Sequence, residues 1–419
     1  MKIIRIFEHQ TLKVGDVRDG VAFTELDFQG LAALAEKNEE KYFKVVNQGI
    51  RFSQYVGIVQ VGALSIEILP KTDARLLDET GTGQSILLDM LQYSHFQKLE
   101  SFQIAAVRPY RHALLHYYMA LFLEATRLIW REGLLKSYTA VRENSTTLKG
   151  QIKLHQQLTL NALHEERLYI QYQKHSFDHP FNAILYRTLQ VLKHFPLPPA
   201  LSVQLNQLLQ AFPQLKARDS LVIDWDRIHF DRSSLRYRAA LELARPILEN
   251  YHPDIRHGEQ SMLAILFDMN QLFEEYLFQR LKALSGDYLR VFQHQRRPFW
   301  RKSYLQPDIL LEMGGRRFVL DAKWKMLTNP QPTMSDLRQM YIYSRFYHAE
   351  NAVLLYPKSG NTTDTMPIYY AETAQGEKDA YTCQLCFLPI LKDNRLNQDI
   401  AIDLIRAISP DPASVPPAF

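Results

Sequence analysis

The sequence predicts a multidomain α+β protein, and three observations support this prediction. The chain has 419 residues, a length typical of two or three domains. Short alternating apolar segments dominate its first quarter, whereas helical periodicity dominates its middle. Helices and strands then mix in an order that favours a small mixed sheet covered by helices. We therefore expect a β-rich domain over 1–105, a mostly helical middle domain over 106–256, an α/β domain over 257–408 and a Pro-rich disordered tail over 409–419.

The first domain is expected to contain one helix among its strands. Thr24 and Asp27 have the spacing of a capping box, so the helix begins there and runs to about Lys37. The segment Gly81–Ser85 resembles a phosphate-binding loop, but Gln84 replaces the lysine. We predict a turn there, before a helix over Ile86–Tyr93, and no nucleotide-hydrolysing site. The predicted strands are Ile3–Phe7, Tyr42–Val46, Tyr55–Val61 and Ala63–Leu69.

The middle domain shows no catalytic pattern, and we interpret it as a helical spacer or interaction stalk. A hairpin over Leu134–Leu154 is expected to turn at Arg142–Ser145. The apolar stretch Ala113–Trp130 contains charged side chains, so a buried helix is favoured over a membrane span. The predicted helices are Tyr110–Glu132, Phe181–Lys193 and Leu235–Glu249.

The segment Tyr304–Lys325 carries the chemistry. It predicts strands over Leu305–Leu311 and Phe318–Lys323 joined by a Gly-Gly turn. Asp308 falls in the first strand, and Asp321 and Lys323 share one face of the second. Two carboxylates and an ammonium group suit Mg²⁺-assisted hydrolysis, although a plain surface hairpin could also carry them.

Other polar residues of this domain are candidates for the same site. A helix is expected over 261–284, and Glu274 lies on its more apolar face. A metal, the lysine or an ordinary salt bridge would each explain that carboxylate. A second helix, Thr333–Tyr347, places Asp336, Gln339 and Tyr343 on one polar stripe. Strands are predicted over Ala352–Tyr356 and Tyr381–Leu388.

A basic and aromatic segment precedes the first aspartate. Its cations could neutralise DNA phosphates, although charges guarding a solvated edge strand would look similar. The net charge of +4 permits nucleic-acid binding without arguing for it. The cations are Arg290, Arg296, Arg297, Arg301 and Lys302, and the interleaved aromatic residues are Phe292, Phe299, Trp300 and Tyr304.

Cysteine usage and the N-terminus indicate the compartment. Cys383 and Cys386 form a lone CxxC that a strand would point to opposite faces, so a zinc site is disfavoured and free thiols are expected. The first ten residues lack the apolar run of a signal peptide. A cytoplasmic protein is therefore predicted.

Pro307-Asp308 and Asp321-Ala322-Lys323 resemble the motif of the PD-(D/E)xK nuclease superfamily. Together with Val56–Lys71, Phe177–Leu189 and Asp336–Ser344, they resemble the McrC family of McrBC-type restriction systems. The resemblance implies a Mg²⁺- or Mn²⁺-dependent endonuclease that acts on double-stranded DNA carrying modified cytosine. It also implies an McrB-like AAA+ GTPase ring as partner, which uses the GTP.

By motif position, the resemblance gives roles to individual residues. Asp308, Asp321 and the Ala322 carbonyl would bind metal, and Lys323 would be the catalytic lysine. Glu274 would be the helix-borne acid and Gln339 the glutamine of the following helix, with Tyr343 as a further DNA contact. Two alternatives remain open, a non-catalytic regulator of a GTPase ring and a stand-alone structure-specific nuclease.

Overall fold

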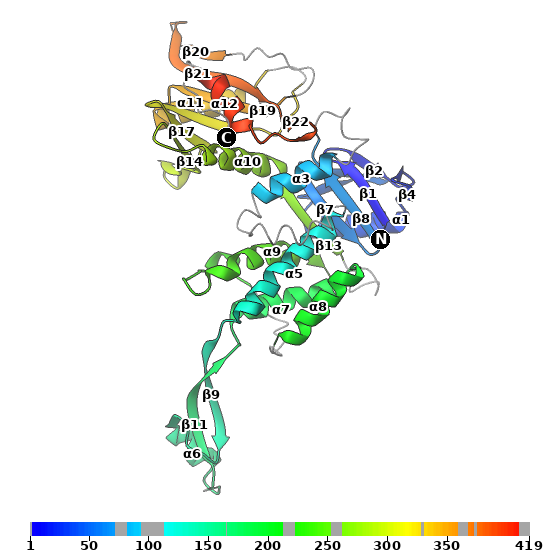
Figure 1. Cartoon of the computed structure of the whole chain (residues 1–419), viewed down its shortest axis with the longest axis vertical. Coiled ribbons are helices and arrows are strands. Elements are labelled where there is room, and N and C mark those ends of the chain that lie inside the picture. Colours follow the sequence, from blue (N-terminus) through cyan, green and yellow to red (C-terminus); the bar gives the residue numbers. More distant parts are fainter. Residues whose placement is uncertain are drawn as a thin grey trace. The chain divides into compact units, whose positions relative to one another are not determined.

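The computed structural model describes residues 2–71, 82–93, 113–164, 166–212, 223–252, 262–327, 331–358, 368–372 and 375–409. The chain divides into two compact units (Figure 1). Met1–Lys98 and Ala264–Phe419 form the first, and Leu99–Leu263 forms the second. The two regions that the sequence predicts as the first and third domains thus belong to one unit. The predicted tail lies outside the described residues, apart from Ser409.

The N-terminal part of the first unit is built on a sheet with the strand order β1-β8-β7-β13. Strand β1 is parallel to β8, and β7 is antiparallel to β8. Helix α1 (Glu25–Lys37) begins at Thr24 with the predicted capping box to Asp27. The sheet strands are Lys2–Phe7, Leu64–Leu69, Tyr55–Val61 and Met262–Asp268, and the smaller strands β2 to β6 are Thr11–Lys13, Val17–Arg18, Val21–Ala22, Phe43–Val46 and Gly49–Phe52.

Two helix predictions in this unit need correction. The helix expected over 261–284 is strand β13 followed by helix α10 (Met269–Ala283). An apolar run that is buried on both faces has no period that separates strand from helix. Helix α3 spans Thr82–Tyr93, so the part of the predicted turn that the structure describes is helical. Its Gln84 donates a hydrogen bond to the buried Glu67 at 3.4 Å and has a structural role.

The second unit contains four helices in its described part that lie around a common core. They are α5 (Leu114–Glu132), α7 (Pro180–Leu192), α8 (Pro199–Ala211) and α9 (Arg238–Glu249), with short 3-10 turns at Trp225–Arg227 and Leu235–Tyr237. No helix among the described residues has the length and apolar character needed to cross a membrane. The predicted helices of the middle region are confirmed with small shifts at their ends, except that residues 110–112 of the first lie outside the described residues.

A two-stranded ribbon extends from these helices (Figure 1). The predicted hairpin over Leu134–Leu154 is wrong, because β9 (Ser137–Ser145) continues through the expected turn. It pairs along its whole length with β11 (Leu168–Ser176), which the sequence analysis missed. Strand β10 (Gln151–Ile152) and helix α6 (Leu154–Leu160) lie between them in sequence.

The C-terminal part of the first unit is a mixed sheet with helices, as predicted. Its strand order is β14-β17-β18-β19-β21-β20. Strands β17 and β18 form the predicted hairpin, and β19 joins β18 and β21 in parallel. The strands are Leu289–Gln293, Ile309–Met313, Arg316–Ala322, Asn351–Pro357, Lys378–Leu388 and Ile368–Glu372 in that order, and the helices are α10, α11 (Met334–Tyr347) and α12 (Ile400–Ile408).

Two cysteines of this sheet bear on the predictions. Cys383 and Cys386 on β21 are buried free thiols, and burial raises the pKa of both to about 12. Cys383 packs in the apolar cluster that includes Met340 and Tyr347 of α11.

A small separate hairpin, β15 (Arg297–Trp300) with β16 (Ser303–Leu305), precedes the β17–β18 hairpin. Strands β22 (Leu391–Lys392) and β23 (Arg395–Leu396) form another.

Gly57 lies where strand β7 packs closely against strand β13, so a substitution there measures how tight this packing is. Its φ is +133°, and an added Cβ would lie 2.2 Å from the carbonyl oxygen of Ile265. We expect Gly57→Ala to lower the free energy of unfolding by about 3 kcal/mol or more, because backbone strain and overpacking act together. Urea denaturation measures the effect. Gly286→Ala is the matched control, since its Cβ would meet open space, and equal stability of both variants would contradict the prediction.

Candidate active site

Asp308 and Asp321 face each other at one end of the β17–β18 hairpin. Residues Ile309 and Leu320 are paired, so the register continues to Asp308 and Asp321. Asp308 precedes β17 and Lys323 follows β18, which corrects the prediction that both lie inside strands. The Asp308 Oδ2 atom accepts a hydrogen bond of 2.9 Å from the Ala322 backbone N–H. The two aspartates and the lysine thus meet at the same end of the sheet.

Asp321 and Lys323 form a partly buried ion pair. The Lys323 Nζ and Asp321 Oδ2 atoms are 2.8 Å apart, and the Asp321 side chain is only 1% exposed. Burial raises the pKa of Asp321, although the charge of Lys323 opposes this shift. Burial alone would lower the pKa of Lys323, but its attraction and hydrogen bond to Asp321, together with the charges of Asp308 and Asp336, raise the pKa. Lys323 therefore keeps its positive charge at neutral pH.

Two further carboxyl groups, those of Asp308 and Glu274, lie in this desolvated environment. Burial raises the pKa of Asp308 well above its usual range, and the charges of Asp321 and Glu274 raise it further. Burial likewise raises the pKa of Glu274, with a smaller contribution from Asp321. Glu274 projects from α10, and its Oε1 atom is 2.5 Å from His294 Nε2. The site therefore gathers more acidic groups than its one lysine can neutralise.

Helix α11 contributes Gln339 to the site. Its Nε2 atom lies 3.3 Å from Asp321 Oδ1 and 3.2 Å from the Tyr343 hydroxyl. The Tyr343 hydroxyl donates to the backbone oxygen of Gln306 at 3.1 Å. Gln339 thus contacts the acidic cluster, as its predicted role requires. Tyr343 is 8% exposed and supports Gln339, so its placement gives no support to a direct DNA contact.

The predicted DNA-binding cations do not all lie together. Arg296, Arg297, Arg301 and Lys302 are exposed and belong to the β15–β16 hairpin or border it. Arg290 pairs across the sheet with Glu312, toward the opposite end of β17 from Asp308. The first four cations therefore lie close in sequence and structure to the strand that leads to Asp308, and Arg290 does not.

The donor set fits a magnesium ion that is bound partly by other ligands. In the described parts of the chain, no three His, Cys, Asp or Glu side chains are already arranged to hold a metal ion. Mg²⁺ usually takes only one or two carboxylates in nucleic-acid enzymes and completes its shell with water and phosphate oxygens. The buried carboxyl groups of Asp308 and Asp321, with raised pKa values, are of the kind that a divalent cation would stabilise as anions.

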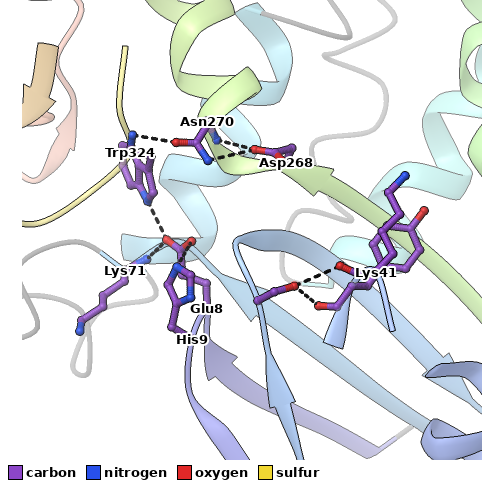
Figure 2. Close-up of polar contacts among 9 residues, drawn as sticks. Glu8, His9, Lys41, Lys71, Asp268, Asn270 and Trp324 are labelled. Atoms are coloured by element: carbon purple, nitrogen blue, oxygen red, sulfur yellow. Dashed lines mark hydrogen bonds and ion pairs between the residues drawn. The ribbon is translucent and has the colours of Figure 1, made fainter. Parts of the chain in front are cut away.

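A polar network from the N-terminal part of the first unit reaches this site (Figure 2). The Trp324 indole Nε1 donates to the buried Glu8 Oε1 at 2.6 Å, and the backbone N–H of Lys71 donates to the same oxygen at 2.9 Å. The Trp324 backbone N–H donates to Asn270 Oδ1 at 3.0 Å, and Asn270 is held by Asp268. The backbone and the indole ring of Trp324, the residue after Lys323, are therefore both held in place.

Sequence reasoning missed Glu8, Asn270, Trp324 and His294. Glu8 and Trp324 are separated by more than three hundred residues, so no local pattern could join them. His294 directly follows strand β14, and its backbone N–H donates to the Asp308 carbonyl oxygen at 3.2 Å. Its contact with Glu274 therefore depends on where β14 ends in the fold, which the sequence does not reveal. The one available signal was Asp268, a residue type that favours the N-cap position of a helix. Its side chain accepts a hydrogen bond from the backbone N–H of Asn270, so a cap there would have pointed to Asn270.

Comparisons with known proteins found a matching family model and similar solved structures. A family model described as McrBC 5-methylcytosine restriction system component matches residues 50–357. A refined half-complex from a tetradecameric assembly of Thermococcus gammatolerans McrB AAA+ hexamers with bound McrC contains a similar chain. The TM-score is 0.67 at 20% identity, covering 97% of this chain and 100% of that chain.

A second solved structure is similar over a smaller part. The cryo-EM structure of the Thermococcus gammatolerans McrBC complex matches with a TM-score of 0.51 at 19% identity, covering 68% of this chain and 89% of that chain. At such identities the two likenesses show a shared fold. No curated protein matches the chain.

The network at Glu8 gives a prediction about pH and stability. Burial raises the pKa of Glu8 to about 7. Because this folded-state value lies above the unfolded value, the folded protein binds the proton more tightly, and Glu8 lowers stability as pH rises from about 4.5 to 7. Glu8→Gln removes this titration and keeps an oxygen acceptor for Trp324. Relative to wild type, its free energy of unfolding should increase from about pH 5 to 8, by at most about 3 kcal/mol.

Denaturant unfolding at several pH values measures this difference. Glu8→Ala should be less stable throughout by roughly 1–3 kcal/mol, because the buried indole N–H loses its acceptor. Glu25→Gln, at an exposed position of α1, is the control for removing a carboxylate. A stability difference between Glu8→Gln and wild type that stays constant with pH would show that Glu8 does not titrate in this way.

Proposed function

Because this chain belongs to the family of McrBC 5-methylcytosine restriction system components, we propose that it is the DNA-cutting subunit of such a system. It would be a Mg²⁺-dependent endonuclease of the PD-(D/E)xK type. The observation that carries this proposal is the grouping of Asp308, Asp321 and Lys323, of which Asp321 is buried and the other two are partly buried, at one end of a mixed sheet. The AAA+ partner would use GTP and recognise modified cytosine.

Asp308, Asp321 and the Ala322 carbonyl oxygen would hold the metal ion, with Mn²⁺ as an alternative to Mg²⁺. When bound, such an ion stabilises negative charge on the scissile phosphate and makes its bound water more acidic. Gln339 holds Oδ1 of Asp321, and the Ala322 N–H holds Oδ2 of Asp308. The carboxylates are thus fixed before substrate arrives, which lowers the cost of reorganisation during the reaction.

Lys323 would act on the phosphate and the attacking water. Its side chain is 22% exposed, so the ammonium group is held by Asp321 yet remains accessible from solvent. A permanent positive charge there stabilises the negative charge that develops on the phosphate oxygens, and it orients the water by hydrogen bonding. Glu274, whose pKa burial raises, is placed to accept a proton near neutral pH.

We place the partner contact on the second unit. The solved relative is described as McrC bound to McrB AAA+ hexamers, and we propose the same kind of partner here. The β9–β11 ribbon carries helix α6, which buries none of its residues. Leu154 and Leu158 of α6 are 71% and 74% exposed, and Leu163 beyond it is 93% exposed. An apolar surface of this kind is typical of a protein contact, and here it would bind the ring and stimulate its GTPase.

Substitutions in the site test the nuclease. We expect Asp308→Ala, Asp321→Ala and Lys323→Ala each to reduce cleavage of methylated plasmid by at least about a hundredfold, since each removes a preorganised charge. Removing divalent ions with a chelator should stop cleavage as well. The assay uses the full chain with its AAA+ partner, GTP and Mg²⁺. Asp287→Ala and Lys282→Ala, at exposed positions of the same unit, are the matched controls.

The outcomes separate the three candidate functions. Wild-type cleavage by Asp321→Ala with its partner would refute the nuclease role and favour a non-catalytic regulator. Cleavage by the chain alone, without partner or GTP, would favour a stand-alone nuclease. The variants should still co-elute with the partner, because the substituted residues lie in the first unit and α6 lies in the second.

The exposed leucines of α6 give an independent test of the partner contact. We expect Leu154→Asp with Leu158→Asp to weaken binding to the AAA+ ring by tenfold or more, because central apolar residues dominate most interfaces. Size-exclusion chromatography and GTPase stimulation measure this. Leu235→Asp, at a 54% exposed position of the same unit, is the control. Unchanged binding by the double variant would place the contact elsewhere.

A further inference from the structure

The β15–β16 hairpin presents an exposed tryptophan beside the candidate active site. We propose that Trp300 stacks on a nucleobase of the DNA next to the cleavage position, while the cations around it hold the adjacent phosphates. This inference rests on the proposed function and adds a specific contact to it. Trp300 is 71% exposed, the highest value among the tryptophans Trp130, Trp300 and Trp324.

The hairpin lies at the catalytic end of the sheet. Strand β14 ends next to Asp308, where the His294 N–H donates to the Asp308 carbonyl oxygen. The chain then forms β15 and β16 and returns at Leu305, three residues before Asp308. Both ends of the hairpin are therefore fixed close to a carboxylate that would bind the metal and the scissile phosphate. A side chain at its far turn is within a few nucleotides of that phosphate.

The base of the hairpin is anchored to helix α11. The Tyr347 hydroxyl lies 2.5 Å from the backbone oxygen of Gln295 and 2.8 Å from that of Leu305, so its single proton is shared between two acceptors at the base of the hairpin. Phe299 packs edge-on against Phe346, with ring centroids 5.8 Å apart. The same helix supplies Gln339 to Asp321. One rigid element thus positions both the acidic cluster and the hairpin, and Trp300 is left without such a packing partner in the part of the chain that the structure describes.

The charges on the hairpin suit a nucleic acid. Arg296 lies over the Tyr304 ring, with its guanidinium carbon 3.8 Å from the ring centroid, and Arg297 lies over Tyr347 at 5.1 Å. Arg301 occupies the turn with a left-handed φ of 49°, a position that favours Gly or Asn. Within the described residues, Arg296, Arg297, Arg301 and Lys302 make no ion pair with a carboxylate. These cations remain available for phosphate groups.

An aromatic ring between unpaired cations matches how single bases are held. Stacking of an unpaired base on an aromatic side chain tolerates any base, because every base has a π-face, and the flanking cations follow the backbone. In a duplex, the base held by Trp300 must therefore be turned out of the helical stack. A surface for a partner protein would be expected to place its cations toward the rim and pair apolar side chains at its centre. Here Arg301 and Lys302 follow Trp300 directly in the turn, and Arg296 and Arg297 lie on the same hairpin, so the substrate DNA is the favoured occupant.

The test compares Trp300→Ala with Trp300→Tyr in the full chain. DNA affinity is measured by fluorescence anisotropy with a labelled duplex that contains an unpaired base, using Ca²⁺ in place of Mg²⁺ to prevent cleavage. We expect Trp300→Ala to lose affinity by roughly tenfold and Trp300→Tyr to retain most of it. Trp130→Ala, at a 44% exposed position in the second unit, is the matched control. DNA should also quench tryptophan emission in wild type and not in Trp300→Ala.

Salt dependence separates stacking from phosphate contact. Trp300→Ala should leave the slope of log affinity against log salt unchanged, whereas Lys302→Ala should reduce it by about 0.9. Equal affinity, quenching and cleavage by wild type and Trp300→Ala would overturn this inference and leave the nuclease proposal standing. Loss of AAA+ partner binding by Trp300→Ala, with DNA affinity intact, would assign the hairpin to the partner and also overturn it. Absence of cleavage by the wild-type complex would instead remove the proposed function itself.

Discussion

The structure depends on keeping several carboxyl groups out of water at one end of a sheet. Asp321 is almost fully buried, and Asp308 and Glu274 are buried enough to raise their pKa values. Burial of unpaired charge is costly, so each group needs a partner that the fold must deliver. Lys323, Gln339, His294 and the Ala322 N–H supply these partners, and they come from different elements. The positions of α10, α11 and β14 therefore all follow from this requirement.

The same requirement explains why the N-terminal strands belong to the unit that holds the site. Trp324 follows Lys323 directly, and it is fixed by Glu8 through its indole and by Asn270 through its backbone. A shift of Trp324 would carry the lysine away from Asp321, since two adjacent residues share one stretch of backbone. The N-terminal sheet thus supports the candidate catalytic residues directly, and a view of it as a separate accessory domain would miss that support.

Sequence patterns predicted the local parts of this arrangement and missed the distant ones. The capping box at Thr24 and the Gly-Gly turn of the β17–β18 hairpin were predicted correctly, because each depends on neighbouring residues. Strand β13 was mistaken for helix, since its identity is set by pairing with β7 two hundred residues away. The partner of β9 was missed for the same reason. The aspartates and the lysine were found because one hairpin carries all three, whereas Glu8 and His294 reach them only through the fold.

The β15–β16 hairpin and the acidic cluster are both attached to helix α11, so they cannot move independently. Tyr347 and Phe346 fix the hairpin, and Gln339 and Tyr343 on the same helix fix the acidic cluster. If the hairpin holds DNA as we propose, the DNA could not move relative to Asp321 without displacing α11 from the sheet, where Met340 and Tyr347 are fully buried. Interiors packed at this density resist such shifts. In the proposed function, binding energy gained at the hairpin would therefore help to place the phosphate at the carboxylates, which is the geometric condition for hydrolysis.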